Sequence, residues 1–279
     1  NYSMDKSNSS SDYIKINNLS FGYENRNIFN GLDLTIAKGS ITSIMGPSGT
    51  GKSTLLKLIT GQVSPNAGEV IFNNQNLATA SRKKLLDIRT KMGVLFQTNA
   101  LFTDLSVFDN VAYPIKEHTN YSDLMVRDLV LMKLNAVGLR GACDLFPEEL
   151  SGGMARRVAL ARAVALDPDL IIYDEPFTGQ DPISKGILVQ LIKLLNDILG
   201  VTSIIVSHDV LETLSIADYN YLISDGTIVD SGNSETLNHS TNPHVEQFMH
   251  GLPDGAIPFH YPASDYQQQI LSKELYGYR

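Results

Sequence analysis

Short apolar runs bounded by turn-forming residues divide the first 45 positions of the chain. The runs at 13–16, 32–36 and 40–45 are β-prone, and turns such as Asn17-Asn18 and Lys38-Gly39 separate them. Apolar runs that alternate with turn signals at this spacing are typical of antiparallel strands. The pattern therefore predicts an antiparallel β layer at the N-terminal end of the fold.

Four short and almost wholly apolar runs indicate a second sheet. They lie at 41–45, 92–96, 170–173 and 202–206, and the first leads through a glycine-rich turn into a helical pattern over 53–60. Strands that are apolar on both faces are typical of parallel sheets covered by helices. The predicted fold class is therefore α/β, with a parallel α/β core beside the antiparallel layer.

The rest of the pattern divides the chain into regions. Between 97 and 151 the periodicity is helical, which predicts an inserted helical subdomain at about 98–165 within a main domain over 13–240. Residues 1–12 are rich in Ser and Asn, and we expect them to be disordered or to be added ahead of the natural start. Residues 241–279 are rich in Pro, Gly, His and Tyr, which predicts a C-terminal extension with a last helical run at 266–275.

Composition narrows the class of protein. The 279 residues are 43% hydrophobic and 19% charged, as in folded globular proteins. No apolar run approaches the roughly 18 residues of a membrane-spanning helix. The net charge of −8 argues against nucleic acid as the main partner. Cys143 is the single cysteine, and no signal-peptide pattern opens the chain, so we expect a reducing, cytoplasmic location.

The glycine-rich turn after the first buried run matches the phosphate-loop pattern. Its glycines let backbone N–H groups converge on a phosphate, while Lys52 supplies positive charge and the Ser53 hydroxyl suits Mg²⁺. The helix that follows directs its positive end at the same anion. A chance glycine turn is the alternative, which the strand–loop–helix context disfavours. The predicted nucleotide-contacting residues here are Gly46, Pro47, Ser48, Gly49, Thr50, Gly51, Lys52, Ser53 and Thr54.

Two adjacent carboxylates end the apolar run at 170–173. Asp174 suits a water-mediated contact to Mg²⁺. Glu175 points elsewhere, because side chains alternate along a strand, and suits a general base that polarises an attacking water. An acidic pair alone is more often a solvated strand end, but the phosphate loop favours the functional interpretation.

A third motif places the chain in a family. Ser151, Gly152 and Gly153 precede a strong helical run at 155–166, so their backbone N–H groups can hold an anion at a helix N-terminus. Alone, this would be a plain helix cap. Together with the phosphate loop and the acidic pair, it makes the chain resemble the ATP-binding cassette family over roughly 13–239.

The resemblance assigns roles to residues that would each be weak evidence alone. Tyr23 is similar to the aromatic that stacks on adenine, and Gln97 to the Q-loop residue that senses Mg²⁺ and the attacking water. Asp181 is similar to the D-loop aspartate and His208 to the switch histidine. Each would otherwise be an ordinary structural residue, but their joint order and spacing favour the roles known in the family.

In this family two cassettes pair head to tail, so the resemblance implies a dimer of this chain with ATP and Mg²⁺ as cofactors. Each ATP would lie between the phosphate loop of one copy and residues 151–153 of the other, and its hydrolysis would drive movement. The implied catalytic residues are Lys52, Gln97, Glu175 and His208. The implied Mg²⁺ ligands are Ser53, Gln97 and Asp174.

Departures from the general pattern point to a narrower group. Met154 stands where most relatives have Gln, and Gln180 stands where Leu is usual before the D-loop aspartate. These residues and the tail at 254–266 resemble the ATPases of bacterial MCE-type phospholipid transporters. The resemblance implies a peripheral subunit at the cytoplasmic face of the inner membrane. It would move phospholipid between that membrane and an MCE-type periplasmic carrier, maintaining outer-membrane lipid asymmetry.

The same resemblance implies a MlaE-type permease, a MlaB-type STAS protein and a MlaD-type MCE protein as partners, with phospholipid as the transported substrate. Residues 100–107 lie where cassettes receive the permease's coupling helix, although Leu101, Phe102 and Leu105 can equally be core residues. Three alternatives remain: the ATPase of a different importer or exporter, a soluble cassette ATPase acting on DNA or ribosomes, and a small-molecule P-loop kinase. The last has no use for residues 151–153 or His208.

The C-terminal extension carries a hypothesis of its own. Phe259, Tyr261 and Tyr266 offer large contact areas with little rotamer entropy to lose. We expect the extension to cross to the partner copy and help hold the dimer. The alternative is a tail folded on its own subunit.

Overall fold

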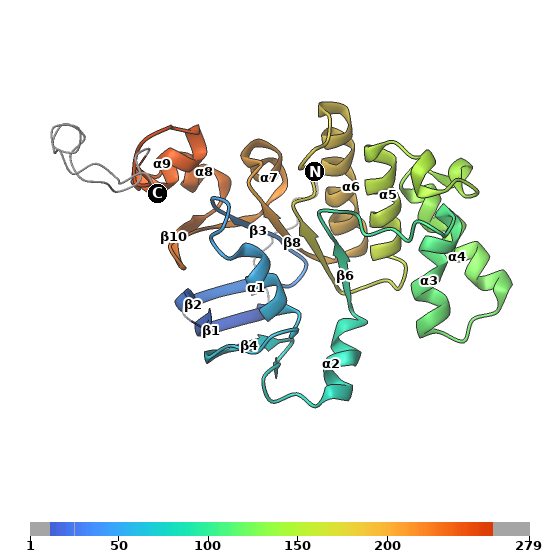
Figure 1. Cartoon of the computed structure of the whole chain (residues 1–279), viewed down its shortest axis with the longest axis horizontal. Helices are drawn as coiled ribbons and strands as arrows, with labels where there is room; N and C mark the ends of the chain where they lie inside the picture. The colour runs from blue at the N-terminus through green and yellow to red at the C-terminus, as the bar shows by residue number, and fades with distance from the viewer. Residues whose placement is uncertain (1–11, 25, 259–279) are drawn as a thin grey trace, which may run out of the picture.

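A long antiparallel ribbon of two strands lies beside a mostly parallel sheet, as Figure 1 shows at the lower left of the molecule. The computed structural model describes residues 12–24 and 26–258. The antiparallel sheet has the order β2-β1-β4-β5. Its strands are β1 Asp12–Tyr23, β2 Arg26–Ala37, β4 Ala67–Phe72 and β5 Gln75–Asn76.

The second sheet has six strands in the order β10-β9-β3-β8-β7-β6. All its neighbours run parallel except the hairpin of β9 and β10. The α/β class with an antiparallel layer and a parallel core, predicted from the sequence, is therefore confirmed. The strands are β3 Ile41–Met45, β6 Met92–Leu95, β7 Leu170–Asp174, β8 Thr202–Ser207, β9 Tyr219–Ser224 and β10 Thr227–Gly232.

The strand prediction had counted positions 41–45 in both sheets. The structure places β3 in the second sheet only, where it pairs in parallel with β8 and β9, because all five of its residues are buried and need cover on both faces. The β9–β10 hairpin and β4 were not predicted. β4 and β10 are only partly buried and so give a weak signal, whereas β9 is buried at every position after its first residue.

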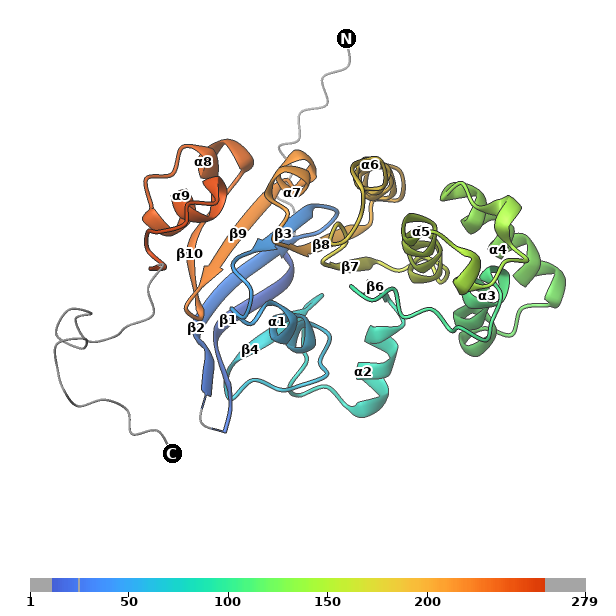
Figure 2. The same cartoon turned by 45° about the horizontal axis from the view of Figure 1, so that its top comes forward.

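Helices flank the parallel sheet on both sides. On the side that carries the antiparallel sheet lie α1 Lys52–Ile59 and α2 Arg82–Arg89, and on the other side α6 Pro182–Leu199 and α7 Val210–Ile216 (Figure 2). Within the predicted helical subdomain range lie α3 Val107–His118, α4 Asp123–Ala136, η1 Arg140–Ala142, η2 Pro147–Glu149 and α5 Gly152–Ala163. In that group α5 packs against α3, α4 and β6, and so joins the subdomain to the sheet.

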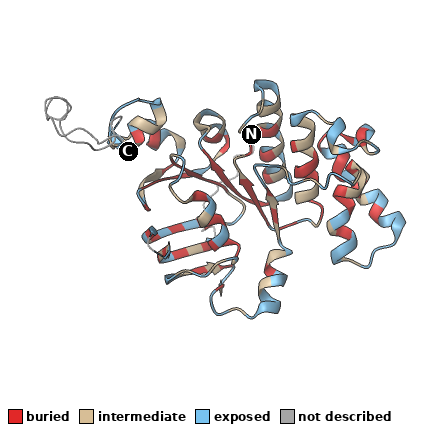
Figure 3. Ribbon diagram, viewed as in Figure 1, coloured by how far each residue is buried: buried red, intermediate tan, exposed pale blue. Residues whose placement is uncertain are grey.

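The side chains of β7 pack into two hydrophobic clusters, one on each face of the sheet. Ile171 and Tyr173 face the cluster formed with α3 to α6, whereas Leu170 and Ile172 face the cluster formed with α1 and the antiparallel sheet. Side chains alternate along a strand, so a run of four apolar residues fills both sides. In this sheet β3, β7, β8 and β9 are accordingly buried along most of their length (Figure 3), whereas β6 and β10 are only partly buried.

The chain ends its described part with α8 Ser234–Asn238 and α9 Pro243–His250. Asn242 caps α9 by accepting from the backbone N–H of His244 at 3.0 Å, and Gly251 ends it in a left-handed conformation. The proline-rich pattern had not predicted this helix. Phe259, Tyr261 and Tyr266, the helical run at 266–275 and residues 1–11 lie outside the described residues, and β1 already begins at Asp12.

No helix in the described ranges is both long enough and apolar enough to cross a membrane.

Candidate functional site

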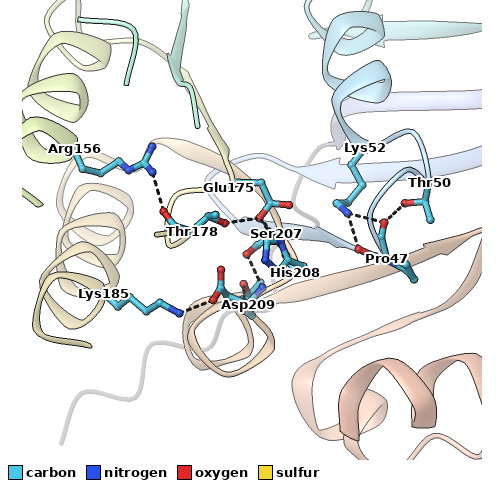
Figure 4. A network of polar contacts seen from close by, with 12 residues as sticks. Pro47, Thr50, Lys52, Arg156, Glu175, Thr178, Lys185, Ser207, His208 and Asp209 are labelled. Atoms are coloured by element: carbon cyan, nitrogen blue, oxygen red, sulfur yellow. Dashed lines mark hydrogen bonds and ion pairs between the residues drawn. The ribbon is translucent and has the colours of Figure 1, made fainter. Parts of the chain in front are cut away.

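The predicted phosphate loop connects β3 to α1 at the carboxyl end of the sheet. Lys52 begins α1, and its side chain is buried. Its Nζ donates to the carbonyl oxygens of Gly46 at 2.6 Å and Pro47 at 2.9 Å (Figure 4). The Thr50 hydroxyl also donates to the Pro47 carbonyl. The loop is therefore curled around the ammonium group that it would present to a phosphate.

Two glycines of the loop are required by its shape. Gly46 has φ of +154°, and a Cβ there would collide with the carbonyl of Ile223. Gly51 has φ of +95°, and a Cβ there would lie 2.5 Å from Cγ2 of Ile28. Both positions exclude side chains, which leaves the loop backbone free to approach a ligand closely.

A cleft of about 880 Å³ opens at this loop. It brings together most of the residues predicted to bind or turn over nucleotide: the whole loop from Pro47 to Thr54, with Gln97, Glu175 and His208. Its lining residues are Arg26, Asn27, Ile28, Pro47, Ser48, Gly49, Thr50, Gly51, Lys52, Ser53, Thr54, Gln97, Glu175, His208, Ser224, Asp225, Gly226 and Ile257.

The carboxylate of Glu175 is held at the cleft by two loops. Its Oε2 lies 2.9 Å from Nδ1 of His208 and accepts from the His208 backbone N–H at 3.3 Å and from the Thr178 hydroxyl at 3.3 Å (Figure 4). Glu175 also has φ of +50°, an unfavourable left-handed conformation for a residue with a Cβ. Such strain is typical of functional positions, because the surrounding contacts must hold it in place.

Burial sets the electrostatics of the loop lysine and the acidic pair. It lowers the pKa of Lys52, although the nearby Glu175 and Asp174 carboxylates act in the opposite direction. Burial, followed by repulsion from Glu175, raises the pKa of Asp174 despite the attraction of Lys52. The charged form of Asp174 is thus disfavoured by its surroundings, and a cation beside it would relieve this.

The predicted Mg²⁺ ligands Ser53, Gln97 and Asp174 offer a hydroxyl, an amide and a carboxylate, which are the oxygen donors that this ion prefers. Ser53 and Gln97 line the cleft, and Asp174 lies at the end of β7, next to the lining residue Glu175. The donor chemistry and the disfavoured charge of Asp174 both fit a bound divalent cation.

The remaining predicted site residues lie elsewhere on the surface. Ser151 caps α5 by accepting from the Met154 N–H at 3.2 Å, and Asp181 caps α6 by accepting from Ile183 and Ser184. Gly153 lies so close to the Ser184 hydroxyl that a Cβ would collide with it. Residues 151–153 and Asp181 therefore form one exposed surface, which lines no part of the cleft of the same chain.

Tyr23 also lies outside the cleft lining. Its side chain is 48% exposed and packs edge-on against Phe21, with ring centroids 5.0 Å apart. Its partner across the β1–β2 hairpin is Arg26, which does line the cleft and donates to the Gly49 carbonyl at 3.4 Å. Tyr23 is thus a half-exposed residue whose cross-strand neighbour lines the cleft.

Other residues at the site were missed by sequence reasoning. Ile257 lines the cleft because the Gln247 amide holds its backbone, donating to the Ile257 carbonyl at 2.7 Å and accepting its N–H at 2.8 Å. Arg26 follows a hairpin turn that could have been recognised, but no local pattern marks Ile257.

An ion pair joins the loop after β8 to α6. Nζ of Lys185 lies 2.5 Å from Oδ1 of Asp209 and 3.4 Å from Oε1 of Glu212. The hydrogen bond to Asp209 raises the pKa of Lys185. Asp209 directly follows His208, so this pair anchors the loop that carries the histidine.

Comparison with known proteins agrees with this geometry. Residues 29–178 match the family model described as "ABC transporter". The chain is 57% identical to the intermembrane phospholipid transport system ATP-binding protein MlaF of Haemophilus influenzae, over 92% of this chain and 98% of that protein. It is 54% identical to the protein of the same name from Escherichia coli, over 92% of this chain and 96% of that protein.

The fold is also similar to a solved cassette. The dimeric structure of a post-hydrolysis state of the ATP-binding cassette MJ0796 bound to ADP and Pi has a TM-score of 0.73 and 30% sequence identity, over 79% of this chain and 98% of that one.

Proposed function

The chain belongs to the ABC transporter family, and we propose that it is the ATP-hydrolysing subunit of a bacterial intermembrane phospholipid transporter. The observation that carries the proposal is its near-full-length identity of 57% to a relative with that function in its name. The convergence of Lys52, Glu175 and His208 on one cleft supports the same conclusion.

The chain is an ATPase, which converts ATP and water to ADP and phosphate. Water attacks the γ-phosphorus while the bond to the oxygen bridging the β- and γ-phosphates breaks. Glu175 accepts the proton of the attacking water, and Lys52 with the loop N–H groups stabilises the charge on the transferring phosphoryl group. His208 contacts the γ-phosphate and orients Glu175 through the 2.9 Å contact. Gln97 positions the water.

Ser53, Asp174 and Gln97 are proposed to hold Mg²⁺ with the nucleotide. When bound, the ion supplies positive charge to the β- and γ-phosphate oxygens. Of the chain's own groups, Lys52 is buried and Asp174 is half-buried, whereas Ser53 and Gln97 are exposed at the cleft, where they can reach a bound nucleotide.

The separation of the site residues into two groups supports a paired arrangement. The cleft holds the phosphate loop, Glu175 and His208, while residues 151–153 and Asp181 lie exposed on a different surface. A second copy placed head to tail would bring its residues 151–153 to the open side of the cleft. Each ATP would then touch both copies. Its adenine would stack on Tyr23 of the copy that holds the phosphates, and the partner's Asp181 would lie near the phosphates.

Exposed aromatic residues on the helical subdomain suit contact with a permease. Phe102 and Tyr113 are 39% and 44% exposed, and their ring centroids lie 4.8 Å apart. Leu101, in contrast, packs against the subdomain core. We propose that the aromatic pair receives a MlaE-type permease at the cytoplasmic face of the inner membrane, in a complex with MlaB-type STAS and MlaD-type MCE proteins.

The C-terminal extension at 241–279 is proposed to strengthen the pair of cassettes. Residues 252–258 fold back on α9 of their own subunit through the Gln247 contacts, so any crossing segment must begin later. Removing residues 259–279 should weaken self-association measured by analytical ultracentrifugation. Unchanged association would contradict a crossing tail and would favour the alternative, in which the tail folds on its own subunit.

The assignment is tested by isolating the complex through this chain from detergent-solubilised native membranes and identifying its proteins and lipids by mass spectrometry. We expect an MlaE-like permease, an MCE protein and phospholipid at stoichiometric levels. Recovery of an unrelated permease, or of ribosomal or DNA-repair proteins, would contradict the transport assignment while leaving the ATPase chemistry intact.

A further inference from the structure

Arg156 is a buried cation without an anionic partner among residues 12–24 and 26–258. It lies on α5, its side chain is 2% exposed, and burial lowers the pKa of its guanidinium. Within the described residues its contacts are all to carbonyl oxygens, and its Nε has no partner. Burying a charge without an opposite charge costs stability, so the position calls for an explanation beyond packing.

The guanidinium joins two loops that carry predicted catalytic residues. Nη1 donates to the carbonyls of Phe96 at 2.9 Å and Gln97 at 2.7 Å. Nη2 donates to the Thr178 carbonyl at 3.2 Å, a contact that Figure 4 shows. The Thr178 hydroxyl in turn donates to Oε2 of Glu175 at 3.3 Å. Arg156 thus fixes the backbone of Gln97 directly and reaches Glu175 through one intervening residue.

The same helix begins at the exposed surface of residues 151–153. Ser151 caps α5, and Arg156 lies little more than one turn further along. A short rigid helix transmits a displacement of its first turn to Arg156. The helix therefore connects residues 151–153 to the loops of Gln97 and Glu175, which line the cleft of the same chain.

We propose that Arg156 is a positioning residue that couples the two ATP sites of a cassette pair. ATP held in the partner's cleft contacts residues 151–153 of this chain, and Arg156 passes the resulting position of α5 to Gln97 and Thr178. This inference rests on the head-to-tail pairing proposed above. Only an arginine fork can reach three carbonyls from two loops at once, whereas a lysine presents a single ammonium group.

The chain offers a matched control on the same helix. Nη1 and Nη2 of Arg162 donate to the carbonyls of Ala100 at 2.8 Å and Asn99 at 2.9 Å. Burial also lowers the pKa of Arg162. Arg162 therefore anchors the same loop to α5, and it also lies over the Phe102 ring, 5.6 Å from the centroid, an interaction that a lysine cation can keep. It contacts neither Gln97 nor Thr178.

The test compares Arg156→Lys and Arg162→Lys in the complete transporter complex, by measuring steady-state ATPase rates over a range of ATP concentrations. We expect wild type and Arg162→Lys to show cooperative dependence on ATP, with a Hill coefficient above 1. Arg156→Lys should bring the coefficient close to 1 and lower kcat roughly tenfold, with nucleotide affinity of the isolated subunit unchanged. A purely structural role would instead lower thermal stability equally in both variants and leave the coefficient unchanged.

A second variant keeps the test decisive if the lysine variant does not fold. Arg156→Met removes the buried charge, preserves much of the volume and should give a folded subunit with the same loss of cooperativity. Cooperativity at the wild-type level in either folded variant would overturn the inference alone. A wild-type complex that hydrolyses ATP without cooperativity would count against the inference and the pairing, and a complex without ATPase activity would count against the proposed function itself.

Discussion

Nδ1 of His208 lies 2.9 Å from Oε2 of Glu175, although the two residues are 33 positions apart in the chain. Glu175 directly follows β7 and His208 directly follows β8. These strands are parallel neighbours, so both residues lie at the same edge of the sheet. Within the described residues the polar contacts of this carboxylate all use Oε2. Oε1 of Glu175, a residue that lines the cleft, is therefore the oxygen that the proposed role as general base would use.

Replacing Glu175 by Gln should abolish turnover while preserving ATP binding. An amide keeps the size of the side chain but cannot accept the water proton, and loss of a general base costs about 10²- to 10⁴-fold in rate. Phosphate release and the binding of a fluorescent ATP analogue measure the two effects separately. Glu148→Gln, at an exposed position on the helical subdomain, is the control. Hydrolysis at the wild-type rate in Glu175→Gln would contradict the assignment of Glu175 as the general base.

Replacing Lys52 by Ala should weaken both ATP binding and hydrolysis. The buried ammonium group shapes the loop through its contacts to Gly46 and Pro47 and supplies charge at the phosphates. We expect a loss of roughly 10²-fold in kcat/KM, as for other preorganised charge-stabilising groups. Lys57→Ala on the exposed face of the same helix should behave like wild type. Equal kcat/KM in the two variants would contradict the assignment.

Replacing Asp174 by Asn should stabilise the nucleotide-free protein at neutral pH. The pKa of Asp174 is raised in the fold, so the folded state binds more protons than the unfolded state, and stability falls as pH rises from the unfolded value of 3.8 through the raised pKa. Asn does not ionise, so the stability of the Asn variant does not fall over this pH range for this reason.

Urea unfolding of wild type and Asp174→Asn at several pH values checks this expectation. The difference in unfolding free energy should be near zero at the acidic end and should grow to roughly 1 kcal/mol or less in favour of Asn above the raised pKa. ATP hydrolysis should be lost in the same variant. A difference that is independent of pH would mean that the charge of Asp174 is not the cause.

Replacing Gln247 by Ala should release the segment that places Ile257 in the cleft. Three hydrogen bonds would be lost: the Gln247 side-chain amide donates to the carbonyls of Leu252 and Ile257 and accepts the N–H of Ile257. We expect roughly threefold weaker nucleotide binding, because each such bond contributes about 1 kcal/mol or less to the local conformation. Hydrogen exchange of residues 252–258 should also become faster.

Glu246→Ala is the control, since Glu246 is exposed on the preceding position of the same helix. Unchanged exchange protection in the Gln247 variant would show that other contacts hold the segment.

Features that depend on local backbone demands could be predicted from the order of residues alone. The apolar runs fixed β6, β7 and β8 to within one residue at their ends, because a strand buried on both faces can contain little else. The phosphate loop was recognisable because glycines at positions such as Gly46 and Gly51 are required by a shape that no other residue allows. The order of the motifs along the chain was sufficient to indicate the family.

Which of these residues come into contact depends on how the elements pack in three dimensions. The contact of His208 with Glu175 depends on the register of β7 against β8, and the position of Ile257 depends on an amide ten residues earlier. The three carbonyls that surround Arg156 come from two distant loops. Hydrogen bonds between segments far apart in the chain leave no periodic trace in the sequence, because their geometry arises from the packing of whole elements. For that reason the residue types of the site can be predicted from the sequence, whereas the contacts between them can be seen only in the fold.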